Sequence, residues 1–349
     1  MKSFLKKLMS TMVMVGLLST SSISYAASHW NYFPIWQGNV WLYKYSDLNG
    51  NEKVTAVNIN DTAYLADSDG YPLDYATSVS TGLLRDAINP LALSGYYGNE
   101  YSQNLLWAQY NGGAWQTLFD FNADQYSAAY QVSFNECLSY DVQAQALQHN
   151  VQVPTGSYHN VKSFEFFHRP EYSGACLNNH DYLFKKMSFA PTVGLISFAT
   201  SQHNYSLVYA NVYNDTNFTQ SAVNTEITQT NGLRTTMILP STHYLAGENK
   251  TISTSFLLRN TGTNMLALDF GTHTYVHTAW LEDVNGVVVA ESYFYLPRIG
   301  FTTLLGADQI AQYLNVEIPL VDVAAGDYIL KGKVLHQGAE ILSMPVTVQ

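Results

Sequence analysis

The residues of this chain that could do chemistry do not form a known catalytic motif. His273 and His277 are the only closely spaced histidines, and on a strand they would lie about 13 Å apart, too far to share one metal ion. The chain has no G-x-S-x-G elbow, no H-E-x-x-H helix motif, no phosphate-binding loop and no dinucleotide fingerprint. We therefore expect no catalytic residues, no cofactor and no bound metal.

One acidic stretch begins like a calcium loop. Asp120 and Asp124 are spaced as in such a loop, but Gln125 and Gln131 stand where it needs glycine and glutamate. The cation cage is thus incomplete. Carboxylates that only the fold brings together could still build a hydrolase site, because glycoside hydrolysis depends on a spatial separation. A hydrolase whose site is not visible in the sequence therefore remains an alternative.

Large aromatic side chains gather in the N-terminal half, interleaved with asparagine and glycine. The most prominent are Tyr96, Tyr97, Trp107 and Trp115. Such a surface suits stacking against sugar rings or a protein partner. The competing interpretation is cross-strand packing within an aromatic-rich sheet.

The N-terminus has the three parts of a secretory signal peptide. Three lysines precede an apolar run from Leu8 to Leu18, and Ser24-Tyr25-Ala26 offers a cleavage site. The run is too short for a membrane-spanning helix, which needs about 20 residues. Residues 1–26 are therefore predicted to direct export, leaving a periplasmic or extracellular protein that does not insert into a membrane.

Two cysteines, Cys137 and Cys176, remain in the exported chain. An even number of cysteines in an oxidising compartment favours a disulfide bond. The pair lacks the C-x-x-C spacing of redox motifs. We expect a structural disulfide between them.

Composition excludes several protein classes. The chain has 349 residues, enough for about two domains, with 12% charged and 14% aromatic residues. The leader holds three of the 16 basic and none of the 27 acidic residues, which leaves 13 basic against 27 acidic residues, a formal charge of −14. A chain this acidic, without a clustered basic face, is not expected to bind nucleic acid.

The elements that would position these residues are short alternating runs separated by turns, which predict an all-β chain. Residues 39–45 and 53–59, joined across an Asn-Gly turn, predict a hairpin. A stretch rich in Asn, Thr, Gln and Ser over 214–236 predicts a polar linker. It divides a β-rich domain at 27–213, an antiparallel meander or half-barrel, from a domain at 237–349. In the latter, alternating strands at 252–258, 275–281, 287–290, 310–318, 328–335 and 341–348 suit a two-sheet sandwich.

Both halves resemble known domains. The segments GENKTISTSFLLRNTGTNMLALDF, LEDVNGVVV and VEIPLVDVAAGDYILKGKVL resemble the domain named for the BsuPI intracellular proteinase inhibitor, an immunoglobulin-like β-sandwich, over Leu239 to Gln349. The segments YFPIWQGNVWLYKY, VPTGSYHNVKSFEF and FAPTVGLISF resemble a β-rich domain of uncharacterised secreted bacterial proteins.

The resemblance implies a protein partner for the C-terminal domain, namely a proteinase. The candidate contact loop contains Leu296, Pro297, Arg298 and Ile299. Pro297 fixes the backbone beside Arg298, a side chain that could fill an acidic specificity pocket. Alternatively, Phe294, Leu296 and Ile299 cover the open end of the sandwich. The leading hypothesis is an exported, non-enzymatic protein-binding protein, and the first alternative is a glycan- or surface-binding envelope protein using the N-terminal aromatic residues.

Overall fold

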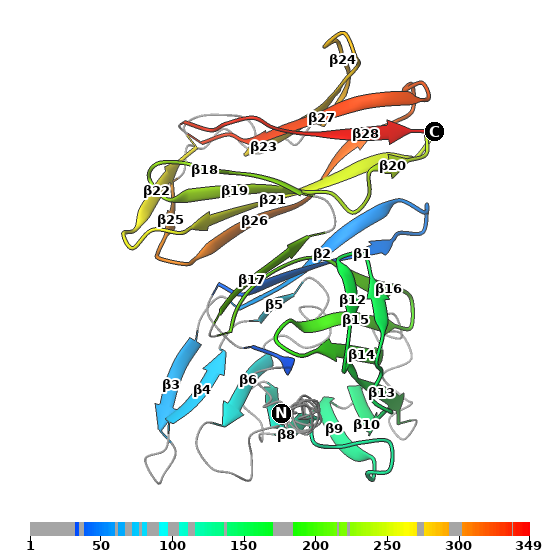
Figure 1. Cartoon of the computed structure of the whole chain (residues 1–349), viewed down its shortest axis with the longest axis vertical. Helices are drawn as coiled ribbons and strands as arrows, with labels where there is room; N and C mark the ends of the chain where they lie inside the picture. Colours follow the sequence, from blue (N-terminus) through cyan, green and yellow to red (C-terminus); the bar gives the residue numbers. More distant parts are fainter. Residues whose placement is uncertain are drawn as a thin grey trace, which may run out of the picture.

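The protein is all-β, as the alternation predicts. The computed structural model describes residues 32–34, 38–59, 62–66, 72–76, 79–81, 91–96, 105–110, 116–135, 138–169, 184–214, 216–221, 224–270, 276–292, 302–336 and 338–349. All 28 elements defined within these residues are β-strands. Figure 1 shows them arranged as an N-terminal set of sheets with a sandwich at one end.

A ten-stranded antiparallel sheet dominates the N-terminal half. Its strands follow the order β5-β2-β1-β16-β15-β14-β13-β10-β9, and β17 pairs with β16. The hairpin predicted across the Asn-Gly turn is confirmed as β1 and β2. The strands are β1 (Val40–Ser46), β2 (Glu52–Ile59), β5 (Val79–Thr81), β9 (Tyr130–Asn135), β10 (Leu138–Ala144), β13 (Lys162–His168), β14 (Phe184–Ala190), β15 (Gly194–Thr200), β16 (Asn204–Asn214) and β17 (Thr216–Ser221).

Two smaller sheets accompany it. One has five strands in the order β3-β4-β6-β7-β8, and the other is the hairpin β11-β12. Their strands are β3 (Thr62–Ala66), β4 (Pro72–Ala76), β6 (Leu91–Tyr96), β7 (Leu105–Tyr110), β8 (Gln116–Asp120), β11 (Val151–Val153) and β12 (Gly156–Tyr158).

Aromatic side chains fill the N-terminal core. Phe119 and Phe189 meet edge to face with their ring centroids 4.7 Å apart. Two buried rings also tie β1 to the start of β15, because Trp41 Nε1 donates to the carbonyl of Val193 at 2.6 Å and the Tyr43 hydroxyl to that of Leu195 at 2.7 Å. Much of the aromatic excess in the described N-terminal residues is therefore core packing.

The C-terminal half is a two-sheet β-sandwich, as predicted. The inner sheet has the order β18-β19-β21-β26, the outer sheet β20-β28-β27-β23-β24, and β22 pairs with β25. The strands are β18 (Asn224–Thr228), β19 (Leu233–Ile238), β20 (His243–Tyr244), β21 (Thr251–Asn260), β22 (Leu266–Asp269), β23 (His277–Glu282), β24 (Val288–Glu291), β25 (Thr302–Leu305), β26 (Ile310–Pro319), β27 (Gly326–Val334) and β28 (Leu342–Val348).

The polar stretch 214–236 differs from the linker that its composition predicts. It contains β17, which pairs with β16, as well as β18 and the start of β19, which pair with each other in the sandwich. β18 is an edge strand of the inner sheet, and threonine favours extended backbone. Backbone pairing therefore makes strands of a segment whose polar side chains give no apolar alternation.

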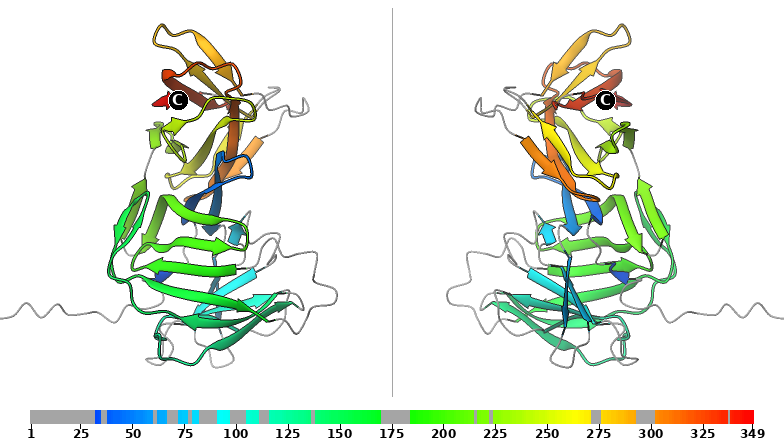
Figure 2. Two further views of the ribbon diagram at one scale, coloured as in Figure 1. Left: turned by 90° about the vertical axis from the view of Figure 1, so that its right-hand side faces the viewer. Right: turned by 90° about the vertical axis from the view of Figure 1, so that its left-hand side faces the viewer.

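The inner sheet of the sandwich packs against the N-terminal sheet. Val40, Leu42 and Val54 are buried in one apolar cluster with Ile238 and Leu257 of the sandwich. Figure 2 shows β1 and β2 reaching up to the sandwich. The two halves thus share a buried interface.

Side-chain amides extend this interface by pairing with backbone across it. The Asn315 amide accepts from the Val54 N–H and donates to the Val54 carbonyl, both at 2.8 Å. The Asn51 amide donates to the carbonyl of Asn249 at 2.9 Å and accepts from the N–H of Thr251 at 3.2 Å. Each half therefore satisfies backbone groups of the other.

We expect Gly332→Ala to destabilise the sandwich by about 1–3 kcal/mol, because a side chain there overpacks the core. A Cβ atom on Gly332 would lie 2.6 Å from Cζ of the fully buried Phe256. The control is Gly326→Ala on the same strand, whose Cβ would meet nothing nearer than Tyr328 at 3.6 Å. Urea unfolding measures both, and equal midpoints would contradict the expectation.

Candidate functional site

The outer sheet of the sandwich presents an accessible face built by strand register. Trp280 lies opposite Lys331, and Ile329 opposite both Glu282 and Pro345. Residues directly opposite in antiparallel strands share a face. This face therefore mixes one large ring and apolar side chains with a few charges.

Two charged side chains on this face, Lys331 and Glu282, form an ion pair. Lys331 Nζ lies 2.7 Å from Glu282 Oε2, and Trp280 Nε1 donates to Glu282 Oε1, also at 2.7 Å. The hydrogen bonds from Lys331 and then Trp280 hold the pKa of the Glu282 carboxyl below its ordinary value. Glu282 thus stays ionised at neutral pH and fixes the orientation of the indole ring.

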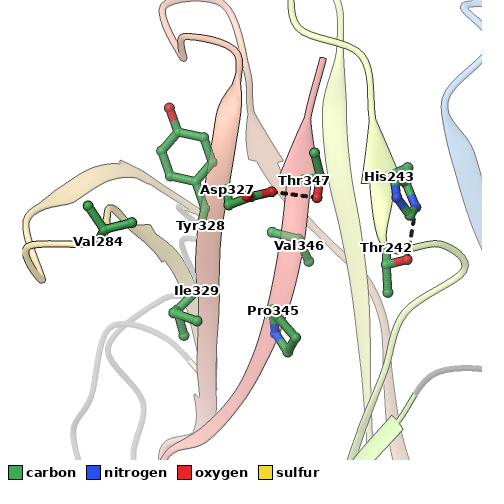
Figure 3. Close-up of a pocket in the computed structure, with 9 residues that line it drawn as sticks. All are labelled: Thr242, His243, Val284, Asp327, Tyr328, Ile329, Pro345, Val346 and Thr347. Carbon is green, nitrogen blue, oxygen red and sulfur yellow. Dashed lines mark hydrogen bonds between the residues drawn. The ribbon is translucent and has the colours of Figure 1, made fainter.

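A shallow hollow of about 480 Å³ lies beside this group. Figure 3 shows Ile329 and Pro345 near one another at one end of it, with Val284 on the side of the β23-β24 turn. At the other end, Thr347 Oγ1 donates to Asp327 Oδ1 at 2.8 Å. The hollow is therefore apolar along most of its length and polar at one end.

The β23-β24 hairpin carries a group of exposed valines. Val284, Val287, Val288 and Val289 are 84%, 58%, 50% and 41% exposed. β24 is the edge strand of the outer sheet, and among the described strands only β23 pairs with it. Figure 1 shows this hairpin at the end of the molecule away from the N-terminal half. Several exposed apolar side chains at a sheet edge are typical of an interaction surface. We call these four valines with Trp280, Ile329 and Pro345 the hairpin patch.

The hairpin patch contains side chains of kinds that occur in protein-recognition surfaces. They supply apolar area and one anchored indole at the edge of a sheet. Within the residues that the structure describes, no group of three or more His, Cys, Asp or Glu side chains could hold a metal ion. In the acidic stretch, Asp120 Oδ1 accepts from the Asn122 N–H and Asp124 Oδ1 from the Tyr126 N–H, each at 2.9 Å.

Several predicted site residues lie outside the described residues. These are both cysteines of the expected disulfide and the whole candidate proteinase-contact loop, together with two of the four aromatic candidates: Cys137, Cys176, Leu296, Pro297, Arg298, Ile299, Tyr97 and Trp115. What the sequence analysis expects of these residues remains a prediction.

The other two aromatic candidates lie on neighbouring strands. Tyr96 ends β6, and Trp107 lies on β7 opposite Ser94 of β6. Of the two histidines, His273 is outside the described residues, whereas His277 is buried at the start of β23. His277 faces the core between the two sheets, beside Phe256 and Tyr313.

The sequence reasoning missed the hairpin patch. The sequence feature that predicts such a patch is the uninterrupted apolar run Val287-Val288-Val289-Ala290 after an Asn-Gly turn. A half-buried strand alternates, so a continuous apolar run on an edge strand must expose some of its side chains.

The chain was compared with protein-family models and with curated proteins. No protein-family model matches the chain, and no curated protein matches it significantly. In the described part of the chain, no helix has the length and apolar character needed to cross a membrane.

Proposed function

We propose that this is an exported, non-enzymatic protein that binds a protein partner through the hairpin patch of its C-terminal sandwich. The observation that carries the proposal is the gathering of four exposed valines on an edge hairpin. Leaving such side chains in water costs free energy in proportion to their area, about 25 cal/mol per Å². A partner strand laid along the edge of the outer sheet at β24 would cover them.

We further propose that the partner is a proteinase, as the resemblance to the inhibitor domain implies. The candidate contact loop follows β24 directly in the chain, since Glu291 ends the strand and Leu296 lies five residues later. Arg298 lies two residues further on, and the seven residues from Glu291 to Arg298 span at most about 25 Å. A proteinase bound at Arg298 would therefore be within reach of β24.

The test is inhibition by the full mature chain of one trypsin-like and one subtilisin-like enzyme. We expect at least one to be inhibited, and Val288→Lys to weaken that inhibition about tenfold or more, because a charged side chain on an edge opposes strand addition. Arg298→Ala should weaken it similarly while leaving the thermal midpoint nearly unchanged.

The matched control is Val321→Lys. Val321 is 54% exposed, close to the 50% of Val288, but lies in the connection before β27 rather than on the hairpin. Inhibition by this variant should equal that of the wild type. If neither enzyme is inhibited by the intact protein, the proteinase is the wrong partner. If Val288→Lys and Val321→Lys weaken inhibition equally, the hairpin patch is not the surface that binds the proteinase.

A further inference from the structure

A second hollow lies on the N-terminal sheet, where small side chains stand in a row. Ser188 lies opposite Ser197, Ser197 opposite Ser206, and Ala199 opposite Asn204, across three consecutive strands. These residues line a groove of about 460 Å³. A row of serine and alanine side chains leaves room above a sheet that longer side chains would fill.

The floor of this groove is held rigidly. Phe198 and Tyr205, which also line the groove, belong to the buried aromatic core, where their rings stack with centroids 4.3 Å apart. This stacking joins β15 to β16 at the floor of the groove. A rigid platform positions hydrogen-bonding groups without an ordering cost when a ligand arrives.

One wall of the groove is the segment that leads into β11. Gln148 is fixed there by reciprocal backbone hydrogen bonds with Val161, at 3.0 and 2.8 Å. Its side-chain oxygen accepts from the hydroxyl of Ser163 at 3.3 Å, and that hydroxyl lies 2.8 Å from the Ser188 hydroxyl. The buried Ser163 and Ser188 thus connect the wall to the floor through a hydrogen-bonded network.

More than half of the residues that line the groove are neutral and polar. Seven of its twelve lining residues are serine, asparagine or glutamine, Lys186 is its one cation, and it has no carboxylate. Hydroxyls and amides both donate and accept hydrogen bonds, which matches the hydroxyl groups of a sugar. A phosphorylated ligand would need more cations, and an extended peptide an unpaired strand edge, whereas β14, β15 and β16 are paired with strands on both sides.

We propose that this groove binds a neutral carbohydrate. The site is independent of the hairpin patch, since it lies on the other half of the chain. It also differs from the aromatic surface expected from the sequence, because Tyr96 and Trp107 belong to the separate five-stranded sheet.

The experiment is titration calorimetry of the full mature chain with four probes, namely tetrasaccharides of glucose, galactose, mannose and N-acetylglucosamine. We expect saturable binding of at least one probe. Ser197→Leu should weaken it tenfold or more by filling the floor. Asn204→Ala, which removes one exposed amide, should weaken it about fivefold.

The matched control is Asn264→Ala, at an exposed asparagine of the sandwich whose backbone carbonyl accepts from Asn260. This variant should bind as the wild type does. Thermal melting checks that each variant is folded, and Asn204→Ala keeps the test valid should Ser197→Leu fail to fold. The proposal is overturned if none of the probes binds at millimolar concentration, or if a probe binds the folded groove variants with wild-type affinity.

Discussion

Asn315→Gly should lower the free energy of unfolding by about 2–3 kcal/mol, the largest effect we expect from a side chain that is not in a hydrophobic core. The wild-type amide satisfies both the N–H and the carbonyl of Val54 at the interface between the two halves. Its loss leaves both groups without these partners, and an unsatisfied buried backbone group costs about 1–3 kcal/mol. Urea unfolding followed by circular dichroism measures the change.

The position of Asn315 explains why this amide reaches β2. Register shifts between Thr254 and Phe256 in the pairing of β21 with β26, and such a bulge redirects a side chain. Asn315 itself has a φ of 56°, in the left-handed region that asparagine tolerates better than most residues. Its side chain then meets an edge of β2 that β5 does not cover, since β5 pairs with residues 57–59 alone.

Asn249→Gly is the matched control. Asn249 has a φ of 59°, so both substitutions relieve the same backbone strain and add the same freedom to the unfolded chain. Its side chain is exposed, and its contribution to the interface is a backbone carbonyl that glycine retains. We expect this variant to stay within about 0.5 kcal/mol of the wild type. Equal midpoints for the two variants would show that the Asn315 bridge contributes nothing.

The fold of the sandwich could be predicted from the sequence because its strands alternate. The runs at 252–258 and 310–318 fall within β21 and β26, where the alternating residues Ile252, Phe256 and Leu258 and the pair Val316 and Ile318 are buried in the sandwich core. Turn residues contributed too, since the Asn-Gly pair between β1 and β2 identifies their hairpin. In these cases the local sequence pattern was sufficient to predict the strands and the hairpin.

The interface and the hairpin patch could not be predicted in the same way. Val40 and Leu42 of β1 are buried against the sandwich, while Trp41 and Tyr43 are buried in the aromatic core. β1 is therefore apolar on both faces, and its sequence does not predict which element covers the second face. Val288 is also apolar, yet its side chain is exposed. Burial of such residues depends on which sheets meet, which is a property of the tertiary structure.

Lowering the pH from about 7.5 to about 5 should cost the protein about 2 kcal/mol of stability through His277 alone. This imidazole is buried beside the rings of Tyr313 and Phe256, at centroid distances of 5.5 and 6.4 Å. Burial lowers the pKa of His277 from its ordinary value of 6.5 to about 4. Between these two values the unfolded chain binds a proton that the folded chain does not, so stability falls as the pH falls through this window.

His277→Phe removes this titration and keeps an aromatic ring among aromatic neighbours. We therefore expect the stability of the variant to depend less steeply on pH than that of the wild type, with the difference growing below about pH 6.5 and levelling off below about pH 4. His149→Gln, at an exposed histidine, should retain the wild-type dependence. Urea unfolding at a series of pH values measures all three proteins. Parallel curves for His277→Phe and the wild type over that range would mean that the buried imidazole does not couple folding to pH.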